Sequence, residues 1–255
     1  MGERNGMDVE HRGDVALVTM NRPPANYFDL GSIRDLADTL DALAGQGCRV
    51  AVLASAGKHF CAGADLGAGA PQDRAEDFRR LYREAVRLFR VPIPVVAAVN
   101  GAAVGGGLGL ACSADFRVTV ASSRFHANFA SLGFHHGFGL SVTLPRLVGS
   151  QRATEMLYTA RRVDGAEACS LGLADRLVDG DDPVPGAIAF AERIAASAPL
   201  TVRSMKATMR AGLADQVEKA TEREFGEQST LWPTEDCRIG LAAAAARTTP
   251  VFVGR

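Results

Sequence analysis

The chain has 255 residues, with 28 Lys and Arg residues against 29 Asp and Glu residues. This length suits one large domain, or a core domain with an appended piece, and it allows a substantial core. Because the net charge is near zero, no field favours nucleic acid or an anionic membrane surface, and we expect neither as a partner. Small-molecule chemistry fits this balance better.

The five cysteines are scattered and never form a C-x-x-C pair, which argues against a disulfide framework and against a zinc site. The first 30 residues contain no basic segment followed by an apolar one, and no apolar run approaches the roughly 20 residues that a membrane span needs. We therefore expect a soluble, cytoplasmic protein in a reducing compartment.

The first quarter of the chain predicts two strands and a helix. Residues 15–20 and 50–54 are apolar runs rich in β-branched side chains, and two prolines follow the first of them. Between these runs, residues 32–44 place their apolar side chains at helical spacing. Ser32 is the expected N-cap, and Gly45 is expected just past the end.

A long loop of small residues, 55–71, separates the second strand from an amphipathic helix predicted over residues 73–90. Loops of this length in compact domains are usually functional or disordered. Residues 95–99 then predict a buried strand, and the glycines 105–107 lead into a short helix over residues 108–113. The order is strand, glycine loop, helix.

This glycine loop is a candidate binding site. Residues without side chains let a ligand approach the backbone, and the first turn of a helix has N–H groups without internal partners. Such groups can bind a carbonyl oxygen or its developing negative charge. Close packing of the backbone and phosphate binding are alternatives. Phosphate is the weaker of them, because the loop lacks both the P-loop ending and the G-x-G-x-x-G spacing.

The second half of the chain divides near residue 182. A strand over residues 116–121 and a helix over 150–160, capped by Ser150, continue an alternation that predicts an α/β core over residues 1–182 with largely parallel strands. Beyond it we expect helices only, over residues 187–198, 201–212, 214–231 and 235–247. This region, 183–255, is too thin for a large core of its own, so it should pack on the α/β part or on another subunit.

Three segments resemble the crotonase, or enoyl-CoA hydratase/isomerase, superfamily. They are HFCAGADL at 59–66, the stretch 98–115 with its three glycines, and residues 151–178. The resemblance extends over nearly the whole chain. It implies a spiral of ββα repeats with a C-terminal helical region, and assembly into homotrimers or dimers of trimers.

The resemblance also implies a substrate and an oxyanion site. Members bind the thioester oxygen of an acyl-CoA with two backbone N–H groups, which here correspond to Ala62 and Gly106. Enolate-like charge develops on that oxygen. Coenzyme A then enters as part of the substrate, and we expect no metal and no further cofactor.

Two positions depart from the family pattern. Hydratases carry a glutamate two residues after the three glycines and another about twenty residues later, and this chain has Gly109 and Phe129 there. Neither residue can transfer a proton. Since general acid–base groups typically contribute about 10² to 10⁴ in rate each, we do not expect efficient hydration.

Replacement groups are sought in the loop 132–140. It contains His135 and His136, and the pKa of histidine suits proton transfer near neutrality. The naphthoyl-CoA synthases and chlorobenzoyl-CoA dehalogenases, other branches of the superfamily, have a functional aspartate in this loop. We favour His136 slightly, because it directly precedes Gly137. The alternative is that both histidines bond to backbone in a glycine-rich turn.

Other positions are candidates for contacts with the substrate. Lys58 stands where relatives often place a basic residue near the CoA phosphates, although it can equally be a solvated surface lysine. Tyr27 either stacks on the CoA moiety or crowds it, and Asp65 is expected to fix its loop through backbone contacts. The full set of expected substrate-binding residues is Tyr27, Lys58, Ala64, Asp65, Leu66, Gly109 and Phe129.

The sequence thus predicts an enzyme that processes acyl-CoA thioesters through an enolate held in a backbone oxyanion site. The alternative is a non-catalytic acyl-CoA-binding or regulatory protein with the same fold.

Overall fold

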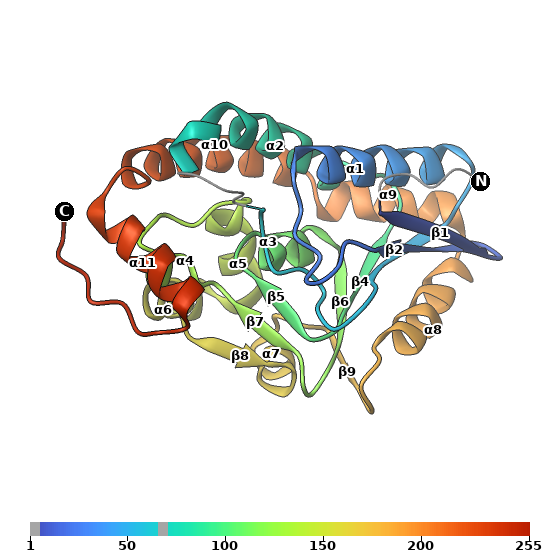
Figure 1. Cartoon of the computed structure of the whole chain (residues 1–255). Helices are drawn as coiled ribbons and strands as arrows, with labels where there is room; N and C mark the ends of the chain where they lie inside the picture. Colours follow the sequence, from blue (N-terminus) through green and yellow to red (C-terminus); the bar gives the residue numbers. More distant parts are fainter. Residues whose placement is uncertain (1–5, 66–70) are drawn as a thin grey trace.

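The computed structural model describes residues 6–65 and 71–255. In this part of the chain the strands form two sheets (Figure 1). The larger sheet has the order β1-β2-β3-β4-β6-β9, with β1 antiparallel to β2 and every other neighbouring pair parallel. Its strands are β1 (Met7–Arg12), β2 (Val15–Met20), β3 (Val50–Ser55), β4 (Val95–Val99), β6 (Phe116–Val120) and β9 (Arg176–Val178).

The smaller sheet has three short strands in the order β5-β7-β8. They are β5 (Ala102–Val104), β7 (Arg124–His126) and β8 (Arg162–Asp164). Along the chain, β4 of the large sheet is followed by β5 of the small sheet and then by a helix, and β6, β7 and a helix repeat this order. This is the expected spiral of ββα repeats, so the prediction of an α/β crotonase-like core is confirmed.

Helices surround the two sheets. Before the last strand they are α1 (Leu30–Gly45), the 3-10 turn η1 (Pro71–Arg74), α2 (Ala75–Leu88), α3 (Gly106–Ser113), α4 (Phe129–Leu132), α5 (Leu140–Val148), α6 (Ser150–Thr159) and α7 (Gly165–Leu171). After it come α8 (Val184–Ala195), α9 (Pro199–Met209), α10 (Leu213–Leu231) and α11 (Glu235–Ala246). As expected, the chain beyond Pro183 is helical.

The central strands of the large sheet are buried on both faces, whereas the edge strands β1 and β9 are mostly exposed. Side chains alternate along a strand, so Val15 and Leu17 of β2 belong to one hydrophobic cluster and Ala16 and Val18 to the other. Helix α8 covers the first face, and α1 lies over the second (Figure 1). Burial on both faces explains why these strands are continuous apolar runs in the sequence.

Both predicted N-caps differ in the structure. The N-cap of α1 is Asp29, whose carboxylate accepts from the backbone N–H of Ser32, while the Ser32 hydroxyl accepts from the N–H of Asp29. Ser32 is therefore the inner partner of a capping box, three residues into the helix. Helix α6 does begin at Ser150, but its N-cap is Gly149, whose φ is 81°.

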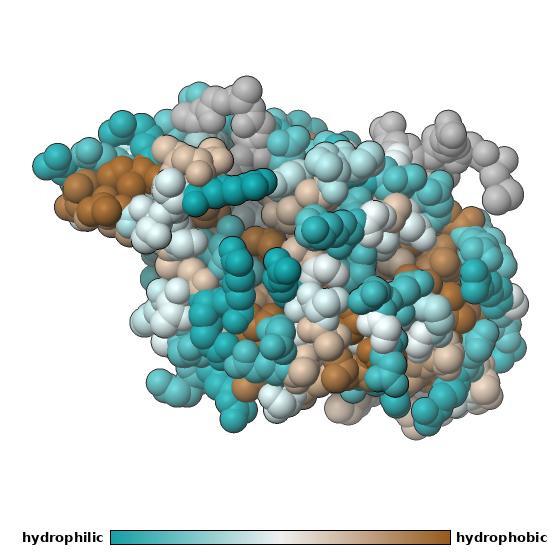
Figure 2. Space-filling model, turned by 60° about the horizontal axis from the view of Figure 1, so that its bottom comes forward, coloured by the Kyte–Doolittle hydropathy of each residue, from teal (hydrophilic) through white to brown (hydrophobic). Residues whose placement is uncertain are grey.

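The C-terminal helices pack on the α/β part. Helix α10 lies beside α2, and α11 lies against α4. Helix α9 contributes no side chain to the hydrophobic clusters of the core and exposes Leu200, Met205 and Met209, each more than 60% accessible. Figure 2 shows further hydrophobic surface among the polar side chains of one face. Within the described ranges, no helix is both long and apolar enough to cross a membrane.

Candidate active site

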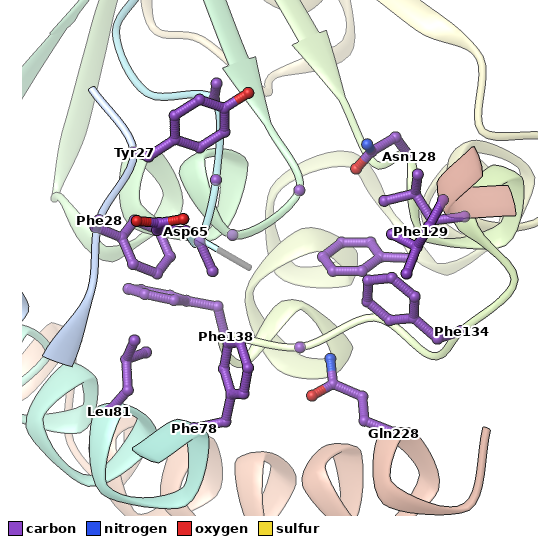
Figure 3. A pocket seen from close by; sticks show the side chains of 18 of the residues that line it. Tyr27, Phe28, Asp65, Phe78, Leu81, Asn128, Phe129, Phe134, Phe138 and Gln228 are labelled. Atoms are coloured by element: carbon purple, nitrogen blue, oxygen red, sulfur yellow. The ribbon is translucent and has the colours of Figure 1, made fainter. Parts of the chain in front are cut away.

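A cavity of about 350 Å³ lies between the glycine loops and the pair of helices α2 and α10. The loops lie at the top in Figure 3, and α10 with Gln228 lies at the bottom. We call the top the head of the cavity and the bottom its base. Between them the wall is mostly aromatic, with side chains from Phe28, Phe78, Phe129, Phe134 and Phe138.

One side of the head is the start of α3. Gly105 has φ 55°, and its own N–H donates to the carbonyl of His126. Gly106 is the first residue of the helix, so its N–H has no partner within the helix, and it has none elsewhere among the described residues. Both residues line the cavity. Gly106 therefore presents a free N–H donor at this side of the head.

The other side of the head is the loop that contains the CAGAD segment. It runs beside β5, because Cys61 N–H donates to Ala102 O and Val104 N–H donates to Cys61 O, both over 3.0 Å. The structure contradicts the prediction that Ala62, the next residue, supplies an N–H to the ligand. The N–H of Ala62 donates to Ala25 O over 3.0 Å, so it is already occupied and cannot serve a ligand.

Ala64, two residues further, has the free amide instead. Around it, Phe28 N–H donates to Gly63 O over 3.0 Å, and Asp65 N–H donates to Phe28 O over 2.7 Å. The N–H of Ala64 takes no part in this bridge and has no partner in residues 6–65 and 71–255. Gly63, with φ 107°, turns the backbone between Ala62 and Ala64.

The two sides of the head are in contact. A Cβ placed on Gly63 would lie only 3.0 Å from the carbonyl oxygen of Val104 and 3.6 Å from the nitrogen of Gly106, and one placed on Gly107 would overlap the carbonyl oxygen of Cys61. Side chains at these positions would push the loops apart. The glycines thus serve close backbone packing and also bring two free N–H groups, of Ala64 and Gly106, to one end of the cavity.

Neither hydratase glutamate position has a carboxylate. Gly109 is buried in α3, and a Cβ there would lie 2.6 Å from the Cβ of Phe138, which leaves no room for a side chain. Gly109 is not among the residues that line the cavity. Phe129 does line the cavity, and its ring lies 5.9 Å from that of Phe134. The wall at this point is apolar.

The base of the cavity is made of side chains that the sequence did not single out. Tyr82 of α2 donates to Oε1 of Gln228 over 2.8 Å, and Nε2 of Gln228 donates to the carbonyl of His135 over 2.9 Å. Trp232, just after α10, completes this end. Helical periodicity placed Tyr82 on the apolar face of its helix, which is the one signal that marked it.

The structure does not bring His135 or His136 to the cavity, since neither is among the residues that line it. Their rings stack on each other with centroids 4.1 Å apart. Nδ1 of His135 lies 2.8 Å from the carbonyl of His136, and Nε2 of His136 lies 2.8 Å from Oγ of Ser141. Burial, followed by the charge of His135, lowers the pKa of His136 to about 4, so this ring is neutral at physiological pH.

A buried carboxylate stands behind these histidines. Glu224 of α10 is 1% exposed and accepts from the N–H of Gly139 over 2.8 Å and from the N–H of Ser141 over 2.9 Å. Burial raises the pKa of Glu224, against the opposing effect of hydrogen bonds from Ser141 and Gly139. Glu224 therefore caps the first turn of α5 and ties α10 to the loop, a role that no local pattern reveals.

The other expected contacts lie at varied distances from the cavity. Tyr27 and Asp65 line it, and Tyr27 is 45% exposed. The main chain of Asp65 ties its loop to neighbouring residues, since its N–H donates to Phe28 O and its carbonyl accepts from Nη1 of Arg74. Lys58 is exposed outside the lining, and Leu66 lies outside the described residues. Within the described residues, no cluster of His, Cys, Asp and Glu could hold a metal ion.

Comparison with known proteins gives the same family from sequence and from structure. The family model described as enoyl-CoA hydratase/isomerase matches residues 10–255. The crotonyl-CoA hydratase of Syntrophomonas wolfei is 30% identical, with 97% of each chain covered. The short-chain-enoyl-CoA hydratase of Clostridium acetobutylicum is 31% identical over 94% of this chain and 95% of its own.

A crystal structure of an enoyl-CoA hydratase from Mycobacterium avium subsp. paratuberculosis superposes with a TM-score of 0.85 at 28% identity. The superposition covers 97% of this chain and 98% of the other. The match therefore includes the C-terminal helices as well as the two sheets. The chain belongs to the enoyl-CoA hydratase/isomerase family of the crotonase superfamily.

Proposed function

We propose that the protein is an enzyme that binds an acyl-CoA thioester, holds the thioester oxygen between the amides of Ala64 and Gly106, and stabilises the enolate. The observation that carries this proposal is the pair of free N–H groups at the head of a cavity whose wall is mostly aromatic. The acyl group would extend from the head toward Tyr82 and Gln228 at the base.

The physical reason is electrostatic. Two fixed N–H groups meet the negative charge that develops on the oxygen, and they need no reorganisation during the reaction. The Gly106 amide also lies at the positive end of α3. Removing one such donor typically costs about 10² to 10³ in kcat.

The relatives named as hydratases suggest hydration, but neither position of the usual glutamate pair can transfer a proton here. Gly109 has no room for a side chain, and Phe129 offers no proton-transfer group. We therefore propose enolate chemistry in which hydration of short enoyl-CoA esters is slow. We also propose that the CoA moiety contacts Tyr27, which is exposed at the edge of the cavity, and Lys58, which is exposed in the loop that leads to the CAGAD segment.

Removal of one amide tests the function. In Ala64→Pro the N–H disappears, while no hydrogen bond seen in the structure is lost. We expect kcat on the ester that the wild type turns over fastest, from a panel of enoyl-CoA esters, to fall by about 10² to 10³. Ala64→Gly keeps the N–H and is the matched control. Equal kcat in the two variants, with folding verified by thermal melting, would contradict the assignment. Binding of acyl-CoA esters without turnover of any would instead indicate a binding protein.

We also propose that the chain assembles as a trimer or a dimer of trimers. Helix α9 exposes Leu200, Met205 and Met209, and a partner subunit would remove this apolar surface from water. Sedimentation at micromolar concentration should give three or six times the chain mass. A monomeric mass would contradict the proposal.

A further inference from the structure

A second hollow lies on the far side of the cavity base. It is a groove of about 310 Å³ between α2 and α10. Its floor is apolar and buried, with Tyr82, Val86 and Phe225. Its rim consists of exposed charged side chains, from Arg79, Arg83, Glu218 and Glu222. The groove therefore opens to solvent above an apolar floor.

Tyr82 lines both the cavity and the groove. It is 9% exposed, and the Tyr82–Gln228–His135 chain of hydrogen bonds holds it in place. On the cavity side it is closely packed, because a Cβ on Gly137 would overlap both the Tyr82 hydroxyl and the Gln228 amide. The ring is thus a fixed wall between the base of the cavity and the apolar floor of the groove.

We propose that Tyr82 closes the acyl cavity at its base and sets the upper length of the acyl chain, so that the substrates are short acyl-CoA thioesters. This rests on the proposed function, which places the thioester at the head. A volume of about 350 Å³ is at the small end for ligand sites, which run from about 300 to 1,000 Å³. An acyl chain that reaches the Tyr82 ring cannot extend further, although the apolar floor of the groove lies directly behind the ring.

The expected effect is a change in length preference. Each methylene that enters apolar surroundings tightens binding by about fourfold, until the chain meets the wall. In Tyr82→Ala the cavity and the groove become continuous, so this gain should persist over several more methylenes. Tyr82→Phe keeps the ring and removes only the hydroxyl, so its length profile should match that of the wild type.

The test is calorimetric titration of the wild type and these variants with saturated acyl-CoA esters from butyryl-CoA to lauroyl-CoA. These esters lack the enoyl double bond, so they are not turned over and the measured quantity is a dissociation constant.

If Tyr82→Ala does not fold, Tyr82→Leu replaces it, because Leu keeps a buried apolar side chain that is smaller than Tyr. A wild type that gains fourfold per methylene along the whole series overturns the proposal, as do identical profiles in the wild type and the smaller variants. If Tyr82→Phe, which keeps the ring, binds longer acyl chains than the wild type does, the ring does not set the upper length. If the wild type binds no ester at all, the proposed function itself fails.

Discussion

The two ends of the cavity are built from different parts of the polypeptide. The head is backbone, since the amides of Ala64 and Gly106 are positioned by glycine turns and by pairing between loops. The base is made of side chains, from Tyr82 and Gln228 on two helices far apart in sequence. A backbone donor survives most substitutions at its own position, whereas a side-chain wall changes with one. The head should therefore determine the chemistry, and the base should determine which acyl group is accepted.

The largest expected effect on rate comes from a substitution in the wall between head and base. Phe129 borders the cavity where hydratases carry a glutamate; its ring lies 5.9 Å from that of Phe134 and 6.3 Å from that of His136, which is neutral at physiological pH. In Phe129→Glu, burial should raise the pKa of the new carboxyl toward neutrality, which suits a proton acceptor. We expect exchange of the α-protons of bound butyryl-CoA with deuterium oxide to accelerate by about 10² to 10⁴, measured by mass spectrometry.

Phe129→Gln is the matched control, because its side chain has nearly the same size as Glu but cannot accept a proton. It should exchange no faster than the wild type. If the Glu and Gln variants exchange at the same rate while both bind the ester, the thioester does not lie with its α-carbon beside position 129. The separation between a chemical head and a selective base would then be wrong.

Substitution of the two histidines behind the wall should have the smallest effect on kcat. His135 and His136 do not line the cavity, and the lowered pKa of His136 keeps its ring neutral above about pH 5. His135→Ala and His136→Ala should each change kcat by less than about tenfold, and titration of His136 should add no step to the kcat profile between pH 6 and 8. A loss of about 10² in either variant, with ester affinity retained, would restore the histidine to the mechanism.

The head was largely predictable from the sequence. Glycines at 105–107 before an apolar helix indicate a free amide, and the structure places one at Gly106. The resemblance places the second donor two residues too early, at Ala62. The error arises at Gly63, whose positive φ redirects the chain, so that Ala62 pairs with Ala25 and Ala64 remains free. A backbone turn of this kind has no signal beyond the glycine itself.

The long strands and helices were predictable for a similar reason. Strands β2, β3 and β4 are buried on both faces and appear as apolar runs, whereas β5, β7 and β8 have three residues each and carry no detectable period. These short strands pair because successive ββα repeats of the spiral bring them side by side.

The base could not be predicted. Helical periodicity puts Tyr82 on the buried face of α2, but the same pattern describes residues that simply pack in a core. Its role depends on Gln228, which is 146 positions away in the sequence. Contacts over such separations come from the topology.

Infrared difference spectroscopy of a carbonyl-¹³C acyl-CoA measures directly whether the thioester carbonyl is bound by the amides of Ala64 and Gly106. Two backbone donors should polarise the carbonyl, so its stretch should move to lower frequency in the complex than in water. Part of that shift should be lost in Ala64→Pro and kept in Ala64→Gly, at full occupancy in each case. A bound ester whose carbonyl stretch equals that in water, or whose stretch is the same in both variants, would contradict the account.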